Sequence, residues 1–405
     1  MAYKIITYSV YALCLLLILW GGKFAGFKKF HDDFMDLEVT KAVRGIAAIG
    51  VIMHHISQEE NFQEAHVMSL FVNAGFLFVA IFFFCSGYGL VKSLKTKPDY
   101  FKGFLRHRLP VLVVPFYVSV VLYTIFYFAL GERFQPVQWI TNTLGLTMVN
   151  TYCWYVVVII LLYLIFYLIY KKIKSDKVRL IIMFAVVILM GAIFAVNGHF
   201  AWWAGPKNWW LRGPAPKWWM DQKVFWFHGE WWVNSAIAFW LGLLFATSEE
   251  KIVAWFKKLY WIKFLVCLIL TVAAWGLSVL GQWKFGYWTE WSGKGPDIAK
   301  KFITFLLQLP FVVFFVMTVF VGMMKFHSSN PVTRFFGKVS LETYMMNLMA
   351  LTICRILYKV FPARSWQYMT LYIVCVVALT IVLALIYKAI NTFFINKIRK
   401  TPKKV

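Results

Sequence analysis

The sequence predicts an all-α polytopic membrane protein, a bundle of about 10–11 transmembrane helices. Apolar residues make up 61% of the 405-residue chain, and the mean hydropathy is +0.69, well above the values of soluble domains. The apolar residues are gathered in runs close to the length that a helix needs to cross a bilayer. Lysines and arginines cluster at the ends of these runs, as they do next to the inner leaflet.

Eleven apolar runs are candidate spans, and the chain shows no internal repeat. The first run lacks a small-residue cleavage pattern, so we interpret it as a retained helix and not as a signal peptide. The candidate spans are approximately 4–22, 42–57, 69–91, 109–130, 152–170, 179–197, 231–247, 263–282, 302–324, 337–357 and 368–390.

Basic residues are distributed unevenly between alternate loops. About two-thirds of the 42 lysines and arginines fall in one set, which includes 23–44, 92–108, 325–338 and the C-terminal tail. Because basic loops remain in the cytoplasm, the pattern predicts an outer N-terminus and a cytoplasmic C-terminus. The net charge of +25 is explained by this anchoring, so we expect membrane lipid and not nucleic acid as the partner of the basic residues.

The predicted organisation has three parts: an extra N-terminal helix with a basic loop (1–40), a transmembrane domain (41–395) and a basic cytoplasmic tail (396–405). No soluble domain is expected, and the longest loop is the outer segment 198–230. The six cysteines lie almost all inside apolar runs and are widely spaced. They therefore indicate buried small side chains, with no disulfide framework and no metal site.

Arg44 and His55 lie eleven residues apart within the second span. Eleven residues make three helical turns, so both side chains share one face about 16 Å apart along the axis. Ionisable groups in a membrane helix usually mark a functional site, and the pKa of histidine suits proton abstraction from a hydroxyl. The alternative is that Arg44 snorkels to headgroups while His54 and His55 lie at the outer interface.

The inner loop after the third span is strongly basic. Its candidate phosphate ligands are Lys102, Arg106 and Arg108, because arginine makes forked contacts with phosphate oxygens. Positive-inside anchoring explains the same charges. Just before this loop, Ser86 and Tyr88 flank Gly87. These two side chains offer hydrogen bonds to a bound cofactor. Alternatively, they belong to a packing seam of small residues.

Aromatic residues are concentrated in the outer segment 202–232, which contains nine tryptophans. Indole rings stack on sugars and also form interfacial belts. We predict Trp154, Glu230 and Trp231 as substrate-binding residues. The alternative is that the aromatic residues form an interfacial belt. In the late span, Glu342 and Asn347 are polar residues within or at the edge of an apolar run. A buried Glu342 carboxylate would need a partner such as a nearby cation; alternatively, Glu342 lies at the inner interface beside Lys338.

Taken in order, these motifs resemble the membrane-bound acyltransferase-3 family over residues 40–390. The matching segments are Arg44-Gly-Ile-Ala47 with His55, Phe83-Phe-Cys-Ser-Gly-Tyr88, Arg106-His-Arg108 through Pro115-Phe-Tyr117, Trp154-Tyr155, Phe239-Trp-Leu-Gly242 and Gly337 to Tyr344. The chain departs from the family pattern where Val111 replaces a second arginine and Asn347 replaces a late histidine. The span 4–22 is an addition.

The resemblance implies an O-acetyltransferase of the bacterial plasma membrane. Its donor would be cytoplasmic acyl-coenzyme A, with acetyl-coenzyme A the commonest choice, and its acceptor a hydroxyl of a cell-envelope glycan or polysaccharide. It assigns His55 as the base, Arg44 to the donor channel and the basic loop to donor phosphates. An acyl-enzyme through Ser86 is a weaker alternative, because Ser86 is expected near the cytoplasmic end.

Two other functions stay open on the sequence alone. A transporter or flippase of an amphipathic or glycan-linked substrate would favour inverted repeats and broken helices, for which Pro115 and Pro310 are the candidates. A non-catalytic sensor would leave Arg44 and His55 without a shared cavity. A homo-oligomer is compatible with either function.

Overall fold

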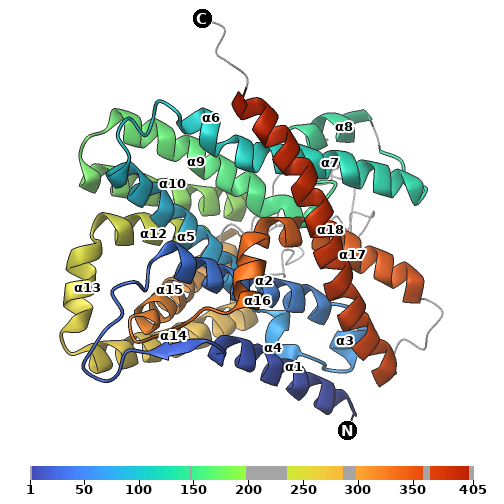
Figure 1. The fold of residues 1–405 in the computed structure, drawn as a ribbon, viewed down its shortest axis with the longest axis horizontal. Coiled ribbons are helices and arrows are strands. Elements are labelled where there is room, and N and C mark those ends of the chain that lie inside the picture. The colour runs from blue at the N-terminus through green and yellow to red at the C-terminus, as the bar shows by residue number, and fades with distance from the viewer. Residues whose placement is uncertain are drawn as a thin grey trace, which may run out of the picture. The chain divides into compact units, whose positions relative to one another are not determined.

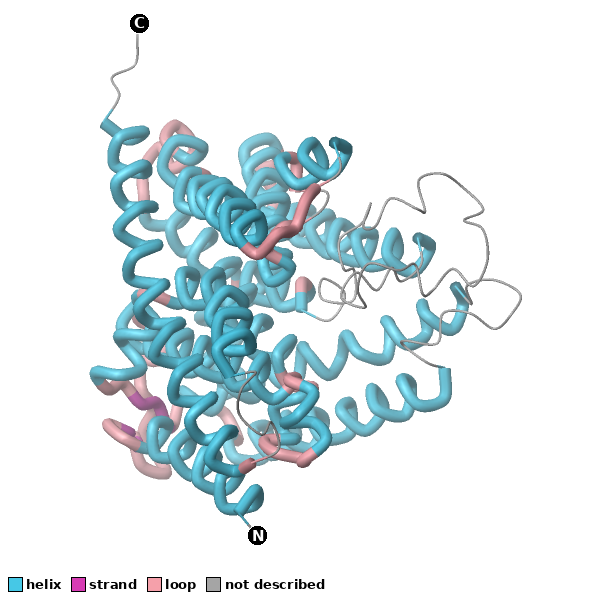
Figure 2. Tube along the Cα trace, turned by 90° about the vertical axis from the view of Figure 1, so that its right-hand side faces the viewer, coloured by secondary structure: helices cyan, strands magenta, loops and turns pink. Residues whose placement is uncertain are grey.

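The structure, a computed structural model, describes residues 2–134, 136–145, 148–197, 235–285, 298–358 and 365–400. Helices lie at all eleven positions predicted from the apolar runs. Within the described residues, eight helices are long and apolar enough to cross a membrane. Figure 2 shows helices throughout, with one small pair of strands. The predicted all-α polytopic class is thereby confirmed.

Two predicted spans are each divided into two helices. The run 69–91 forms α4 (Ser69–Val72) and α5 (Gly75–Thr96). The run 337–357 is α17 (Ser340–Leu357), preceded by a separate helix, α16 (Pro331–Lys338). A reciprocal pair of hydrogen bonds between Asn330 and Thr333 starts α16 before the apolar run begins.

The chain divides into two compact units. The first comprises residues 1–82 and 319–405. Besides α4, α16, α17 and the ends of α5 and α15, its elements are α1 (Ala2–Leu19), β1 (Gly22–Phe24), α2 (Leu37–Ser57), α3 (Glu60–Glu64), β2 (Phe326–Ser328) and α18 (Trp366–Lys400).

Helix α2 is the most deeply buried candidate span of this unit, and 78% of an 18-residue apolar stretch of it is buried. It crosses α16 (Figure 1) at two glycines. A Cβ at Gly45 would lie 1.8 Å from the Thr333 carbonyl oxygen, and one at Gly337 would lie 2.0 Å from the Lys41 carbonyl oxygen. Only glycine allows two backbones to approach this closely, so both residues are required by packing.

Strands β1 and β2 form a short antiparallel pair that the sequence did not predict. Lys23 lies opposite His327 in this pair. The strands belong to the loops 23–44 and 325–338, which the basic-residue pattern places on one side of the membrane. Their hydrogen bonding agrees with that assignment.

The second unit comprises residues 83–318. Its elements are the remainder of α5, α6 (Phe104–Arg108), α7 (Pro110–Ala129), α8 (Pro136–Thr143), the 3₁₀ turn η1 (Thr151–Cys153), α9 (Trp154–Lys172), α10 (Asp176–Asn197), α12 (Ile237–Thr247), α13 (Glu249–Lys257), α14 (Tyr260–Phe285) and most of α15 (Ile298–Met323).

In this unit α5 and α12 also pack through glycine. A Cβ at Gly87 would lie 2.2 Å from the Phe239 carbonyl oxygen, and one at Gly242 would lie 2.2 Å from the Phe84 carbonyl oxygen. The small residues of the Ser-Gly-Tyr segment therefore do form a packing seam. Near the C-terminal end of α5, Lys95 donates to the carbonyls of Ala246 and Thr247 at the end of α12, so the two helix ends lie together.

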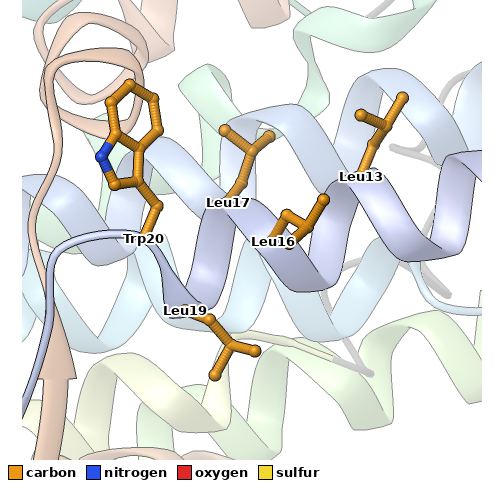
Figure 3. A pocket seen from close by; sticks show the side chains of 5 residues that line it. All are labelled: Leu13, Leu16, Leu17, Leu19 and Trp20. Carbon is orange, nitrogen blue, oxygen red and sulfur yellow. The ribbon is translucent and has the colours of Figure 1, made fainter.

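The outer surface of α1 carries an apolar groove of about 530 Å³. Figure 3 shows the side chains that line it, which are Leu13, Leu16, Leu17, Leu19 and Trp20. Only 11% of the residues of α1 are buried. Such a surface suits contact with lipid chains, and it carries no group for acid–base chemistry.

Candidate active site

Helix α2 carries both ionisable residues singled out by their spacing. His55 is 8% exposed, and Arg44 is half-buried three turns earlier. Among the described residues, the buried Nε of Arg44 has no hydrogen-bond partner. An unsatisfied guanidinium nitrogen is costly in a membrane protein, so this group is suited to receiving an anion or a carbonyl oxygen. A passage joining Arg44 to His55 stays a prediction.

His55 is held by a chain of hydrogen bonds from two other helices. Its Nδ1 lies 2.8 Å from the Asn347 Oδ1 on α17. The Asn347 Nδ2 in turn donates to Thr380 Oγ1 on α18 at 3.0 Å. Asn347 and Thr380 are fully buried. Because an amide oxygen only accepts, the His55 Nδ1 must carry the proton, and Nε2 carries the lone pair of the neutral ring.

His54 is adjacent in sequence and has a different environment. Its Nδ1 donates to the backbone carbonyl of Phe71 at 2.8 Å. Its ring also packs against the start of α5, where a Cβ at Gly75 would lie 2.2 Å from it. His54 therefore joins α2 to the turn before α5, which is a structural role. The two rings are 5.2 Å apart, but only the ring of His55 is bonded to a side chain.

An ion pair fixes the two helices that meet at His55. Arg355 on α17 donates to both carboxylate oxygens of Glu59, at 2.8 and 2.6 Å. Glu59 follows the end of α2, four residues after His55, and its side chain is only 12% exposed. A two-point arginine–carboxylate contact has a defined geometry, so it sets the register that places Asn347 opposite the imidazole.

The basic segment predicted to hold donor phosphates lies in the second unit. Arg108 donates to Ser93 Oγ at 2.7 Å and lies over the Tyr100 ring. Arg106 is half-buried. Lys102 is exposed and paired with Asp99 at 2.9 Å, an exposed pair that contributes little to stability. Arg108 is thus held in place by neighbouring side chains, whereas Lys102 is exposed.

Ser86 and Tyr88 are engaged inside the same unit. The Ser86 Oγ lies 3.3 Å from the Tyr155 hydroxyl. The Tyr88 hydroxyl donates to Glu249 Oε1 at 2.9 Å, and Glu249 also binds Lys92. These contacts join α5 to α9 and α13. A role of either residue toward the donor stays a prediction.

Of the predicted acceptor-binding residues, only Trp154 lies in the described part of the chain. It begins α9, is 6% exposed, and contacts the rings of Phe83 and Tyr155. Glu230 and Trp231, with most of the tryptophan-rich segment, lie outside the described residues. Glu342 is half-buried on α17 and forms no ion pair among the residues that the structure describes.

Sequence reasoning missed the contact between Asn347 and His55. The sequence analysis noted Asn347 as a polar residue of the late span and as the replacement of a late histidine. Nothing in the spacing of two residues 292 positions apart connects it with His55. Its only sequence signal was an amide inside an apolar run, which must find a partner in a bilayer.

The helices and the buried, oriented imidazole define an integral membrane protein with a candidate acid–base site. A family model of the acyltransferase-3 family, described as an acyltransferase domain, matches residues 40–388. The match covers most of the chain, so the protein belongs to this family and is a membrane-bound acyltransferase. No curated protein and no solved structure matched the chain.

Proposed function

We propose that this acyltransferase moves a short acyl group from cytoplasmic acyl-coenzyme A to a hydroxyl on the outer side of the membrane. Acetyl is the proposed group and a cell-envelope glycan the proposed acceptor. The observation that carries the proposal is the Asn347 contact, which leaves the lone pair of His55 on Nε2. A neutral buried imidazole in this form is suited to accept a hydroxyl proton.

In the proposed reaction His55 Nε2 takes the proton of the acceptor hydroxyl as its oxygen attacks the thioester carbonyl. The carbon–sulfur bond then breaks, and the coenzyme A thiolate leaves and is protonated by the imidazolium. Asn347 keeps Nδ1 protonated and stabilises the imidazolium through its amide oxygen. The reaction needs no acyl-enzyme, and no cofactor beyond the donor is invoked.

The donor would be bound by cations at the cytoplasmic side. Arg106 and Arg108 are proposed to contact its phosphates, because a guanidinium pairs with two phosphate oxygens at once. Arg44 is proposed to contact the donor within the membrane, where the unsatisfied Nε would gain a partner. These roles extend the family assignment to residues of this chain.

The matched pair His55→Gln and His54→Gln tests the assignment, because the two residues are adjacent and similarly buried. Purified full-length protein would be supplied with acetyl-coenzyme A and envelope glycan, and release of free thiol measured. We expect His55→Gln to lose activity by about 100-fold or more, while folded His54→Gln keeps most of it. Normal activity of folded His55→Gln would refute the assignment.

Glycan mass spectrometry of cells with and without the protein tests the acceptor. A new acetyl mass on an envelope glycan supports the proposal. If the protein instead moves labelled substrate across vesicles without thiol release, the transporter alternative is correct.

A further inference from the structure

A second group of ionisable side chains lies away from His55, in β2 and in the loop that follows β1. It consists of His31, Asp33 and His327, whose ligand atoms all lie within 4.8 Å of one another. His327 is part of β2, and the other two follow β1 by several residues. Nearly 300 positions separate the two histidines, so the cluster exists only in the folded chain.

The spacing of the three groups fits a small divalent metal ion. In a tetrahedral zinc site with ligand distances of about 2.0–2.1 Å, neighbouring ligand atoms lie about 3.3 Å apart. Here Asp33 Oδ1 is 3.4 Å from His327 Nε2 and 3.8 Å from His31 Nδ1. The closest pair already has the required separation, and small side-chain movements would bring the third atom into place.

The protonation of His31 favours coordination. Its Nε2 donates to the Lys23 carbonyl oxygen at 3.1 Å. The opposite nitrogen, Nδ1, therefore carries the lone pair of the neutral ring and faces the carboxylate. Metal-binding histidines typically donate their other ring N–H to a carbonyl or carboxylate in this way.

His327 is the feature that a purely structural interpretation does not explain. It is 4% exposed, and neither of its ring nitrogens makes a hydrogen bond in the described part of the chain. Its approach to Asp33 lacks hydrogen-bond geometry. A buried imidazole without such a partner is costly.

The backbone around the cluster is fixed independently of any ion. Lys325 donates to three carbonyls of the loop before His31, those of Gly26, Phe27 and Lys29. Two backbone hydrogen bonds add to this, from Ala25 to Lys325 and from His31 to Met324. The loop is therefore held against β2, and the three side chains are brought together before a metal binds.

We propose that His31, Asp33 and His327 form a binding site for a divalent transition-metal ion, for which zinc has the best-fitting ligand set. Two imidazoles and one carboxylate leave one position of a tetrahedral zinc ion for water. Lys23 lies opposite His327 in the strand pair, and its charge opposes the ion. We therefore expect an exchangeable metal and not a permanent structural one. The site is independent of the acyl-transfer proposal.

The test uses the full-length protein in detergent, purified through a tag without histidines and stripped of metal. Zinc is added alone, excess is removed, and bound zinc is measured by mass spectrometry. Asp33→Asn removes the carboxylate, and Asp32→Asn is the matched control because both positions are exposed. His327→Gln and His31→Gln remove the imidazoles one at a time.

We expect about one zinc ion per chain in wild type and Asp32→Asn, and at least tenfold weaker binding in the other three variants. Zinc should also raise the unfolding temperature of wild type but not of Asp33→Asn. Unfolding curves recorded without zinc show that each variant is folded. The proposal is overturned if wild type binds no zinc, or if Asp33→Asn and His327→Gln bind it as tightly as wild type.

Discussion

Replacing Asn347 by leucine tests whether the hydrogen-bond chain behind His55 serves catalysis. Leucine has the same branched arrangement of side-chain heavy atoms as asparagine and is bulkier, so the change removes both hydrogen bonds without opening a cavity. The His55 Nδ1–H loses its acceptor at 2.8 Å, and Thr380 loses its donor. The imidazole is then free to rotate or to move its proton to the other nitrogen.

The expected size follows from the cost of an unsatisfied buried donor, which is about 1–3 kcal/mol. A ring that reorients to avoid this cost occupies the productive state less often, and each 1.36 kcal/mol corresponds to about tenfold in rate. We therefore expect kcat to fall by about 10–100-fold. Thr380→Val leaves the bond between His55 and Asn347 intact, so its loss should be only about 2–5-fold.

The assay is thiol release from acetyl-coenzyme A with saturating acceptor, measured together with thermal unfolding. Asn347→Asp is the restoring variant, since a carboxylate still accepts from His55 Nδ1. If folded Asn347→Leu keeps more than half of wild-type kcat, the orientation argument is wrong. A change in KM alone, with kcat preserved, would also refute it.

Two further predictions concern packing and the donor. Gly45→Ala would place a Cβ 1.8 Å from a carbonyl oxygen, so we expect a loss of about 2–3 kcal/mol in unfolding free energy. Gly276→Ala, inside α14 with nothing within 4 Å, should not destabilise the protein. Equal unfolding curves for the two variants would contradict this. Arg108→Ala should raise the KM for acetyl-coenzyme A about 5–10-fold with kcat little changed. Lys97→Ala, at an exposed position of the same basic segment, should not. Equal KM values in kinetic assays would contradict the donor-phosphate role.

The membrane fold could be predicted because each span is a local property of the chain. A helix crossing a bilayer satisfies its own backbone groups, so length and hydropathy reveal it without its neighbours. The break between α16 and α17 was missed because side-chain hydrogen bonds of Asn330 and Thr333 define the start of α16, and hydropathy does not report them. The strand pair was missed because three-residue strands have too little pattern.

The candidate site could be predicted only in part. The spacing of Arg44 and His55 placed them on one helical face because both belong to one rod. The same spacing could not separate the roles of His54 and His55. That distinction depends on what each ring meets, a backbone carbonyl for His54 and a side-chain amide for His55.

The sequence by itself determined the spans and the helical face carrying Arg44 and His55. Both follow from periodicity and hydropathy along a single segment. Only the tertiary structure decided which nitrogen of His55 bears the proton, and which residues meet at the strand pair. Those outcomes depend on contacts between segments nearly 300 residues apart, and no periodicity along the chain encodes such contacts.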